Sequence, residues 1–478
     1  MSSLATADAR PALAVCVASC LAFALAGLTG FSPLALLALI VAVALACFSP
    51  VGAIAAAVAS LPYFYRPLDI AGQHVAASEL LLFAALLGTG LQVLVAAVES
   101  PAGALRKVQR RLLPVLRSPL AIAAVGLVGL GGLLVLMPYD PTHRADSLRE
   151  WRWTLFEPAL LLGLLIWHRR DPILRELVAI ALIAGGTVAS LHALGDYALG
   201  GGVAVGGVTR IAGPYPHPNA LALMTVRVAA LAFVWAVVDP RVRRWIIPLL
   251  VICAVTVAAT FSRGAMLAGL VAVAIVLVNA PPRIRLAGAG SVIAGLALAV
   301  AVARDRMLDL FGGGSGSLRI DIWTSALRMI DDRPVRGYGP DQFLYAYLPR
   351  YVQPTAWGER FTAHAHNFLL DFWIRLGIIG AAFVGFVVLM CLLALARRLR
   401  SPIRSQPLGM AALVALVAII ANGLVDNAFF SHDLAMSCWL LAWLAFGAES
   451  DGAGAEGGVE IARAGVGRGW LYRLTPLR

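Results

Sequence analysis

The sequence predicts an all-α fold, a polytopic bundle of helices that crosses a membrane. Apolar residues make up 60% of the 478-residue chain and charged residues only 13%, and the mean hydropathy is +0.84. Apolar runs long enough to cross a hydrocarbon core of about 30 Å recur from one end of the chain to the other. This composition excludes an ordinary soluble globular domain.

Hydropathy predicts roughly 12–14 transmembrane helices. They are expected at residues 12–30, 31–48, 50–64, 77–97, 119–138, 153–168, 172–194, 217–238, 244–261, 263–280, 286–303, 366–396, 407–425 and 433–448. The interval 304–365 is the only long polar stretch between these spans, so it is expected to form one large outward-facing loop. Chemistry that needs water is expected there.

Basic residues in the short loops predict the orientation of the bundle, because such residues stay on the cytoplasmic side. The loops in question carry Arg106, Lys107, Arg110, Arg111, Arg117, Arg169, Arg170, Arg241, Arg243, Arg244, Arg283, Arg285, Arg397, Arg398, Arg400 and Arg404. All of them fall on one side if both termini are cytoplasmic, which leaves 304–365 outside. Much of the +12 formal charge is then explained by orientation, and no nucleic-acid partner is needed.

The chain is expected to have four parts. Residues 1–303 form an N-terminal transmembrane bundle with outward-facing arginines, and 304–365 form the large outward loop with amphipathic helices. Residues 366–448 form the C-terminal transmembrane helices. The glycine-rich and basic stretch 449–478 is expected to be a cytoplasmic tail that contacts the membrane surface.

Two arginines lie on the outward side, where orientation does not require them. Arg210 follows a glycine-rich stretch and precedes the helix expected from 217, and Arg263 lies in a tight turn between two apolar segments. A lone interfacial arginine commonly reaches lipid phosphates or pairs with a carboxylate. Two planar guanidinium groups on one face instead favour a site for a diphosphate, which arginine geometry suits better than lysine.

The outward loop is expected to contain an amphipathic helix that ends at residues 331–334. Its apolar residues at helical spacing are Leu318, Ile320, Ile322, Trp323, Leu327 and Ile330. Arg319 and Asp321 lie on the same helix. Either of them could contact a ligand, but a solvated helix face explains them equally well, so neither is assigned to the core of the site.

His366 is the candidate catalytic base. It lies where the loop becomes a membrane helix, and the dipole of that helix opposes protonation of the imidazole. A neutral imidazole is what a general base requires, although an ordinary helix-capping histidine explains the position equally well. His364 is the competing candidate. Asp426 could orient an imidazole or be an exposed loop carboxylate, and His432 and Asp433 share that ambiguity.

Taken together, these residues resemble the O-antigen ligase and O-antigen polymerase superfamily of bacterial membrane glycosyltransferases. The resemblance covers roughly residues 200–430 and consists of an ordered set of elements. They are Arg210-Ile211-Ala212-Gly213, Pro218-Asn219, Ser262-Arg263-Gly264, Arg319, Asp321, Trp323, Pro334, Gly337-Tyr338-Gly339, Phe343, His366-Asn367, Gly377 and Gly380. Each element alone is weak evidence, and their order and shared outward side make the resemblance specific.

The resemblance implies a GT-C-like helical fold in the bacterial cytoplasmic (inner) membrane, with the active site facing the periplasm. It implies a glycan donor carried on undecaprenyl diphosphate, a lipid or glycan acceptor, and membrane lipids as surroundings. By resemblance, Arg210 and Arg263 bind the donor diphosphate, His366 deprotonates the acceptor hydroxyl, and Asp426 supports the base. The chain has no Asp-x-Asp motif, so we expect metal-independent transfer without a cofactor. Backside attack by the acceptor hydroxyl would invert the anomeric centre.

Ligase and polymerase activities share this arginine and histidine arrangement. A ligase would deliver the glycan to lipid A core or another terminal acceptor, and a polymerase would join carrier-linked repeat units. The single large outward loop modestly favours the ligase. A polysaccharide or lipid transporter is the alternative of another class, but transporters often show internal repeats and charges near the bilayer midplane. The sequence predicts neither the glycan nor the oligomeric state.

Overall fold

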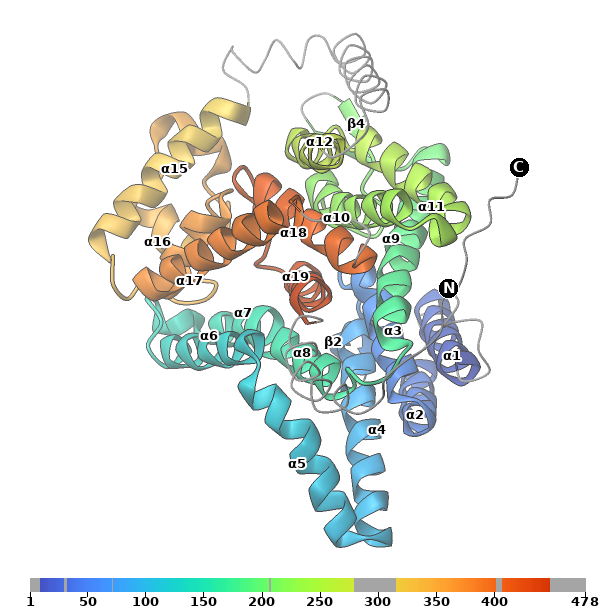
Figure 1. Cartoon of the computed structure of the whole chain (residues 1–478). Helices are drawn as coiled ribbons and strands as arrows, with labels where there is room; N and C mark the ends of the chain where they lie inside the picture. The colour runs from blue at the N-terminus through green and yellow to red at the C-terminus, as the bar shows by residue number, and fades with distance from the viewer. Residues whose placement is uncertain are drawn as a thin grey trace.

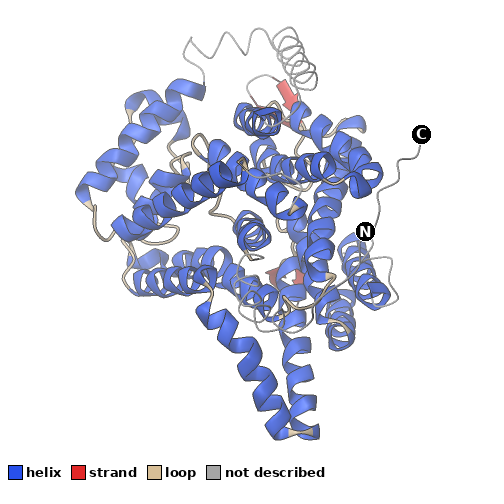
Figure 2. Cartoon of the chain, in the orientation of Figure 1, coloured by secondary structure: helices blue, strands red, loops and turns tan. Residues whose placement is uncertain are grey.

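The computed structural model describes residues 9–29, 32–70, 72–205, 208–278, 315–400 and 406–447, and the statements that follow concern these residues. Most of them are helical (Figure 2). The strands form two short antiparallel hairpins, β1 (Leu68–Ile70) with β2 (Gln73–Val75) and β3 (Val203–Val205) with β4 (Val208–Arg210). The predicted all-α class is confirmed.

Seven described helices are long and apolar enough to cross a membrane. They are α1 (Ala9–Thr29), α4 (Ala77–Glu99), α6 (Pro119–Leu136), α9 (Leu174–Ala198), α10 (Pro218–Val238), α11 (Pro240–Ala259) and α17 (Phe368–Arg398). Shorter apolar helices are α2 (Ser32–Phe48), α3 (Pro50–Ser60), α12 (Arg263–Val278), α18 (Pro407–Gly423) and α19 (His432–Phe446). The molecule is therefore a multi-pass membrane protein.

The remaining described helices are shorter or more polar. They are α5 (Pro101–Arg117), α7 (Arg144–Trp151), α8 (Glu157–Trp167), α15 (Ser315–Asp332) and α16 (Phe343–Arg350), with a π-helical turn at Arg152–Phe156 and 3-10 turns at Leu61–Tyr63, Pro141–His143 and Pro354–Glu359. The predicted span 286–303, the domain boundary near 303 and the tail 449–478 lie outside the described residues. Each other predicted span coincides with described helical structure.

Helices α10 and α18 form the centre of the bundle (Figure 1). They pack against each other, and α10 also contacts α9, α11 and α12. Most of α10 is buried, including the large side chain of Trp235. A helix that is apolar on all sides is expected in the interior, whereas α11 and α17 leave more of their apolar surface for lipid.

The described basic loops gather at one end of the bundle. The Arg111 guanidinium lies 5.9 Å from the indole ring that ends α8. Arg175, at the start of α9, donates to the carbonyl of Leu444, and Arg398, at the end of α17, donates to the carbonyl of Ala445. We call this end, formed by residues 106–117, 169–175, 397–400 and 444–447, the basic end. The predicted common side is confirmed for these loops, and its cytoplasmic location stays a prediction.

Residues 315–367 pack at the opposite end, with α15 and α16 side by side at the left of Figure 1. Ile322, Met329 and Tyr347 form a small separate core there. The predicted amphipathic helix is confirmed as α15, which ends at Asp332. Its predicted apolar face is partly wrong, because Ile320 and Leu327 are exposed.

Helix α17 is broken at Gly377, where the backbone adopts φ 65° and ψ −161°. This conformation is in a region that side chains disfavour, and a Cβ atom here would lie only 2.0 Å from the carbonyl oxygen of Val335. The Ile378 amide donates to that same carbonyl over 3.2 Å. The turn before α16 therefore docks onto the break, which separates residues 368–376 from the long span that follows.

Candidate active site

His366 and Asp426 form a hydrogen-bonded pair at the end opposite the basic end. His366 Nδ1 lies 3.2 Å from Asp426 Oδ1, although the two residues are 60 positions apart. Asn367 joins the two segments, because its Oδ1 caps α17 and its Nδ2 donates to the Leu424 carbonyl over 3.0 Å. The structure thus brings the predicted base and its predicted support together.

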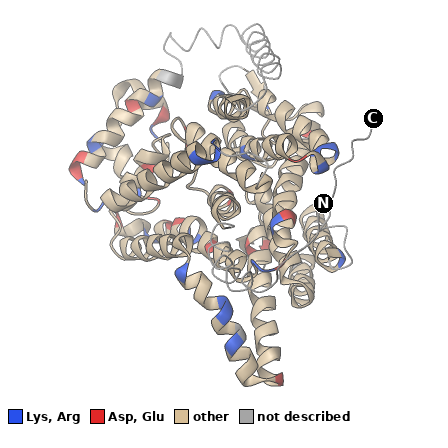
Figure 3. Cartoon of the chain, viewed as in Figure 1, with Lys and Arg blue, Asp and Glu red and all other residues tan. Residues whose placement is uncertain are grey.

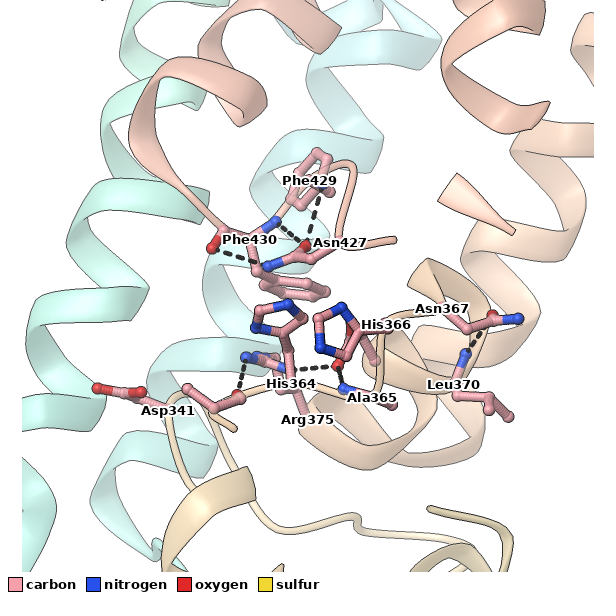
Figure 4. A network of polar contacts seen from close by, with 12 residues as sticks. Asp341, His364, Ala365, His366, Asn367, Leu370, Arg375, Asn427, Phe429 and Phe430 are labelled. Atoms are coloured by element: carbon pink, nitrogen blue, oxygen red, sulfur yellow. Dashed lines mark hydrogen bonds and ion pairs between the residues drawn. The ribbon is translucent and has the colours of Figure 1, made fainter. Parts of the chain in front are cut away.

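The backbone of His366 is left-handed, with φ 52°. Trp323 Nε1 donates to the His366 carbonyl over 3.4 Å, and Thr362 Oγ1 lies 3.4 Å from His366 Nε2. The imidazole of His364 lies beside that of His366, with the ring centroids 4.3 Å apart (Figure 4). Trp323 therefore holds the backbone of His366, and Thr362 and His364 lie against its ring.

The electrostatics of the pair favour an ionised Asp426. Burial alone would raise the pKa of Asp426, but the hydrogen bond and charge of His366, with His364 and Arg319, hold that pKa below its usual range. An ionised carboxylate accepts the proton on Nδ1, which leaves Nε2 of His366 as the nitrogen that can take a proton. Burial and the charge of His366 lower the pKa of His364 to about 3, so His364 is neutral at ordinary pH.

Arg319 belongs to this site, contrary to the expectation that left it out of the core. Its NH2 lies 3.6 Å from Oδ2 of Asp426, and its side chain is only 20% exposed. Asp321 instead accepts a hydrogen bond from Thr355 over 2.7 Å within the loop. Arg319 and Trp323 are four residues apart on α15, so they share a helix face. That spacing was the sequence signal for the placement of Arg319.

Arg210 is buried at the end of β4. Its Nε donates to the carbonyl of Thr260 over 2.6 Å, and its NH2 donates to Oδ1 of Asn219 over 2.8 Å. Thr260 ends α11, and Arg263, which is half-buried, begins α12 three residues later. Arg210 therefore holds the turn that presents Arg263, which places the two predicted arginines at one end of the bundle.

The start of α12 packs against the end of α18, just before Asp426. Gly264 follows Arg263, and a Cβ atom at Gly264 would lie 2.4 Å from Oδ1 of Asn422. The close approach requires a residue without a side chain. It also connects the arginine turn to the loop that carries Asp426.

His217 is a further polar residue of this end that the sequence analysis did not select. Its Nδ1 accepts a hydrogen bond from the amide of Asn219 over 3.1 Å and so caps α10. Burial and the neighbouring charge of Arg210 lower the pKa of His217, and Asp426 and His366 also act on it electrostatically. The sequence signal was a histidine directly before Pro218, but this position was interpreted only as the start of the predicted span 217–238.

A buried ion network supports the loop that carries His364 and His366. Arg375 donates to Glu150 over 2.9 Å, to Asp371 over 2.8 Å and to the carbonyl of Ala363 over 3.2 Å. Asp371 Oδ1 accepts from the amide of Ala365 over 2.9 Å. The network therefore fixes the backbone on either side of His364 (Figure 4). Charged residues inside a predicted span were the sequence signal for it.

His432 and Asp433 hold helix ends together. His432 is fully buried, with Nδ1 3.1 Å from Glu157 and Nε2 3.1 Å from the hydroxyl of Ser78. Asp433 accepts a hydrogen bond from the hydroxyl of Tyr215 over 3.0 Å. Both side chains are buried and have partners within the bundle, so neither is an exposed loop residue, and these contacts are those of a structural role.

The group His364, His366 and Asp426 also has the donor atoms of a metal site, because its possible ligand atoms lie within 4.8 Å of one another. Imidazole and carboxylate are common zinc ligands. The guanidinium of Arg319 beside the same carboxylate opposes a divalent cation, since it already supplies positive charge at 3.6 Å. The geometry therefore fits a base supported by a carboxylate better than a metal centre.

An apolar cavity of about 880 Å³ runs between α5, α6 and α8 on one side and α17, α18 and α19 on the other. Phe368 and Phe429 line it beside the His366–Asp426 pair, and Arg117 and Arg169 line it at the basic end. The cavity thus extends from the candidate site toward the opposite end. Its lining suits a long hydrocarbon chain.

Comparison with known families identifies the segment that contains much of this site. Residues 248–385 match the family model described as O-antigen ligase. The matched range includes Arg263, Arg319 and His366, and Arg210 and Asp426 lie outside it. No curated protein matches the chain.

Proposed function

We propose that this membrane protein, whose residues 248–385 match the O-antigen ligase family, is an enzyme that transfers a glycan from an undecaprenyl-diphosphate carrier to an acceptor hydroxyl. The observation that carries the proposal is the contact of 3.2 Å between His366 and Asp426. The pair lies at the end opposite the basic end, and the apolar cavity begins beside it. A base, a water-accessible loop and a hydrocarbon path are the parts that such a transfer needs.

In the proposed reaction, the acceptor oxygen attacks the anomeric carbon of the donor glycan. A new C–O bond forms as the bond from that carbon to the diphosphate breaks, and the electron pair leaves with undecaprenyl diphosphate. The acceptor proton moves to Nε2 of His366, and the carboxylate of Asp426 stabilises the imidazolium that results. A single displacement inverts the anomeric centre.

The leaving diphosphate gains negative charge in the transition state. Arg263 and Arg210 are proposed to stabilise that charge, because guanidinium groups fixed in a low-dielectric site act without reorganisation. Arg210 also keeps the turn in place through its bond to Thr260. A conservative Arg210→Lys change is expected to weaken donor binding, since lysine cannot make both of the directed bonds.

The proposed site faces the periplasm, on the outer face of the cytoplasmic membrane. This location follows from the separation between the basic end and the His366–Asp426 end, together with the positive-inside rule. We favour the ligase type, with lipid A core or another terminal acceptor, because one outward segment, 304–365, is much larger than the other polar loops. The polymerase remains the alternative.

The experiment that tests the proposal uses purified protein in nanodiscs and an undecaprenyl-diphosphate glycan. We expect His366→Ala to abolish transfer while donor binding is retained, and His364→Ala to keep most of the activity. A chelator is expected to have no effect. The acceptor that becomes glycosylated separates a ligase from a polymerase.

Other outcomes would redirect the assignment. Full transfer by His366→Ala with loss in His364→Ala would move the base to His364. Loss of transfer on chelation, restored by a divalent cation, would favour a metal at the histidine pair. Donor binding without transfer to any acceptor, together with movement of the donor across the membrane, would support the transporter.

A further inference from the structure

Helix α5 (Pro101–Arg117) has a strongly amphipathic surface at the basic end. Leu105, Leu112 and Leu116 recur at intervals of seven and four residues, so they share one face, and they are 60%, 41% and 62% exposed. Arg106 and Arg110 lie on the adjoining face. A helix with this pattern suits the boundary between headgroups and acyl chains.

Arginines from two segments line one pocket beside this helix. Arg106, Arg110 and Arg111 of α5 and Arg170, which follows α8, surround a space of about 460 Å³. Figure 3 shows basic residues in blue along α5. In the ranges that the structure describes, none of these four arginines has a carboxylate within 4.0 Å. Orientation by the positive-inside rule requires arginines at this end, but it does not require them to converge on one pocket.

The pocket concentrates positive charge. Burial and the charge of Arg170 lower the pKa of Arg111, although Asp171 acts in the opposite direction. The Asp171 carboxylate already accepts the amide of Ile173 over 3.1 Å. The stacking of Arg111 on Trp167 holds one guanidinium in place. An anion that enters this pocket would relieve the repulsion between neighbouring arginines.

We propose that the pocket of Arg106, Arg110, Arg111 and Arg170 binds the phosphate of an anionic phospholipid in the cytoplasmic leaflet. The acyl chains of that lipid would lie along the leucine face of α5. Guanidinium groups suit phosphate oxygens, and basic pockets beside transmembrane helices at the cytoplasmic side suit acidic headgroups. The inference does not depend on the proposed glycan transfer, because the pocket lies at the other end of the molecule.

The test is lipid binding by the purified full-length chain, measured by native mass spectrometry with phosphatidylglycerol and phosphatidylcholine. We expect a clear preference for phosphatidylglycerol. The double variant Arg106→Gln/Arg110→Gln is expected to bind it about 30-fold more weakly, which corresponds to roughly 1 kcal/mol for each arginine removed. Arg106→Lys/Arg110→Lys is expected to keep most of the binding and shows whether these positions tolerate substitution.

The matched control is Arg397→Gln/Arg400→Gln, which removes the same charge from exposed positions at the same end. We expect it to bind phosphatidylglycerol like the wild type. Equal loss in both double variants, or no preference over phosphatidylcholine, would overturn the proposal. The proposal would also be overturned if inorganic phosphate displaced bound phosphatidylglycerol as effectively as added phosphatidylglycerol does, because the pocket would then be a site for free phosphate.

Discussion

His366 combines an uncommon backbone conformation with a defined side-chain partner. Its φ of 52° is in the left-handed region, which costs a non-glycine residue roughly 1–2 kcal/mol. The hydrogen bonds from Trp323 to its carbonyl and from its ring to Asp426 offset that cost. Such backbone strain is concentrated at functional sites. The conformation therefore supports a functional role for the ring, because a histidine that only caps a helix would not need a strained backbone.

The proposed role of Asp426 predicts a large effect of Asp426→Asn on the rate. The amide cannot accept the Nδ1 proton as a carboxylate does, so the imidazole loses the tautomer that leaves Nε2 free. We expect transfer to fall about 10²- to 10⁴-fold with donor affinity unchanged, measured by single-turnover kinetics and donor binding. Asp321→Asn, which changes a half-buried acid of the same loop region that bonds Thr355 and not His366, should have little effect. Wild-type turnover in Asp426→Asn would show that His366 does not need Asp426 to act as the base.

His364 predicts a pH dependence of stability. Its folded pKa is about 3, compared with 6.5 for the free side chain, so between these pH values the unfolded state binds more protons than the folded state. Stability should then decrease as the pH falls from about 6.5 toward 3. The thermal midpoint of His364→Gln in detergent should change less over this range than that of the wild type. Equal slopes would contradict the assignment, and His74→Gln, at an exposed position, is the control.

At the scale of elements, the break in α17 connects the outward loop to the bundle. The turn around Gly337 docks against it, since a Cβ atom at Gly337 would lie 2.5 Å from the carbonyl of Ile374. The Tyr338 amide donates to that carbonyl over 2.7 Å. The first segment of α17, with Asn367 at its start, is thereby fixed relative to α15. This arrangement aligns His366 with Arg319 and Trp323.

The break predicts different effects of alanine at two glycines of α17. Gly377→Ala places a Cβ atom 2.0 Å from the Val335 carbonyl at a positive φ, so we expect a loss of about 2–4 kcal/mol in the free energy of unfolding. Gly385→Ala has open space around it and should be neutral or slightly stabilising. Thermal unfolding of both variants in the same detergent tests this difference. Equal midpoints would mean that α17 is continuous.

The buried network predicts that removal of the Arg375 charge lowers stability and activity, and that lysine at this position partly restores both. Arg375→Met would leave Glu150 and Asp371 without their cation, and breaking a buried pair in this way costs about 3–5 kcal/mol. We expect a lower thermal midpoint and a lower kcat, because the backbone of Ala363 loses its donor. Arg375→Lys should recover part of both. A fall in the midpoint with unchanged kcat would limit the network to stability.

At the scale of the whole molecule, hydropathy predicted the spans well because the length of an apolar run is a local property. It did not predict that α5 is helical, because the basic residues of α5 lower its mean hydropathy below that of a membrane span. It also did not detect the break at Gly377, because the run from 366 to 396 is apolar throughout. The site residues that the sequence did predict, Arg210, Arg263, His366 and Asp426, lie at or near the ends of predicted spans, where a charged residue is conspicuous. Arg319, Glu150 and Arg375 have partners far away in sequence, which periodicity does not reveal.

The separation of the molecule into two ends, joined by an apolar cavity, leads to a prediction about the carrier. If the cavity of about 880 Å³ holds the hydrocarbon chain of the donor, Ala442→Trp, a change in its lining, should obstruct that chain. The chain comes from the bilayer and not from water, so its packing against the cavity lining decides how well it binds. A long carrier makes more of these contacts than a short one and therefore depends more on this path.

We therefore expect the KM for an undecaprenyl donor to rise about tenfold in Ala442→Trp, and the KM for a donor with a much shorter chain to change little. Ala382→Trp adds the same bulk at an exposed position of α17 outside the cavity lining and should leave both values unchanged. Steady-state kinetics with the two donors measures the effect. An equal rise for both donors would place the obstruction at the reacting end, because only a contact along the hydrocarbon path can distinguish carriers by length.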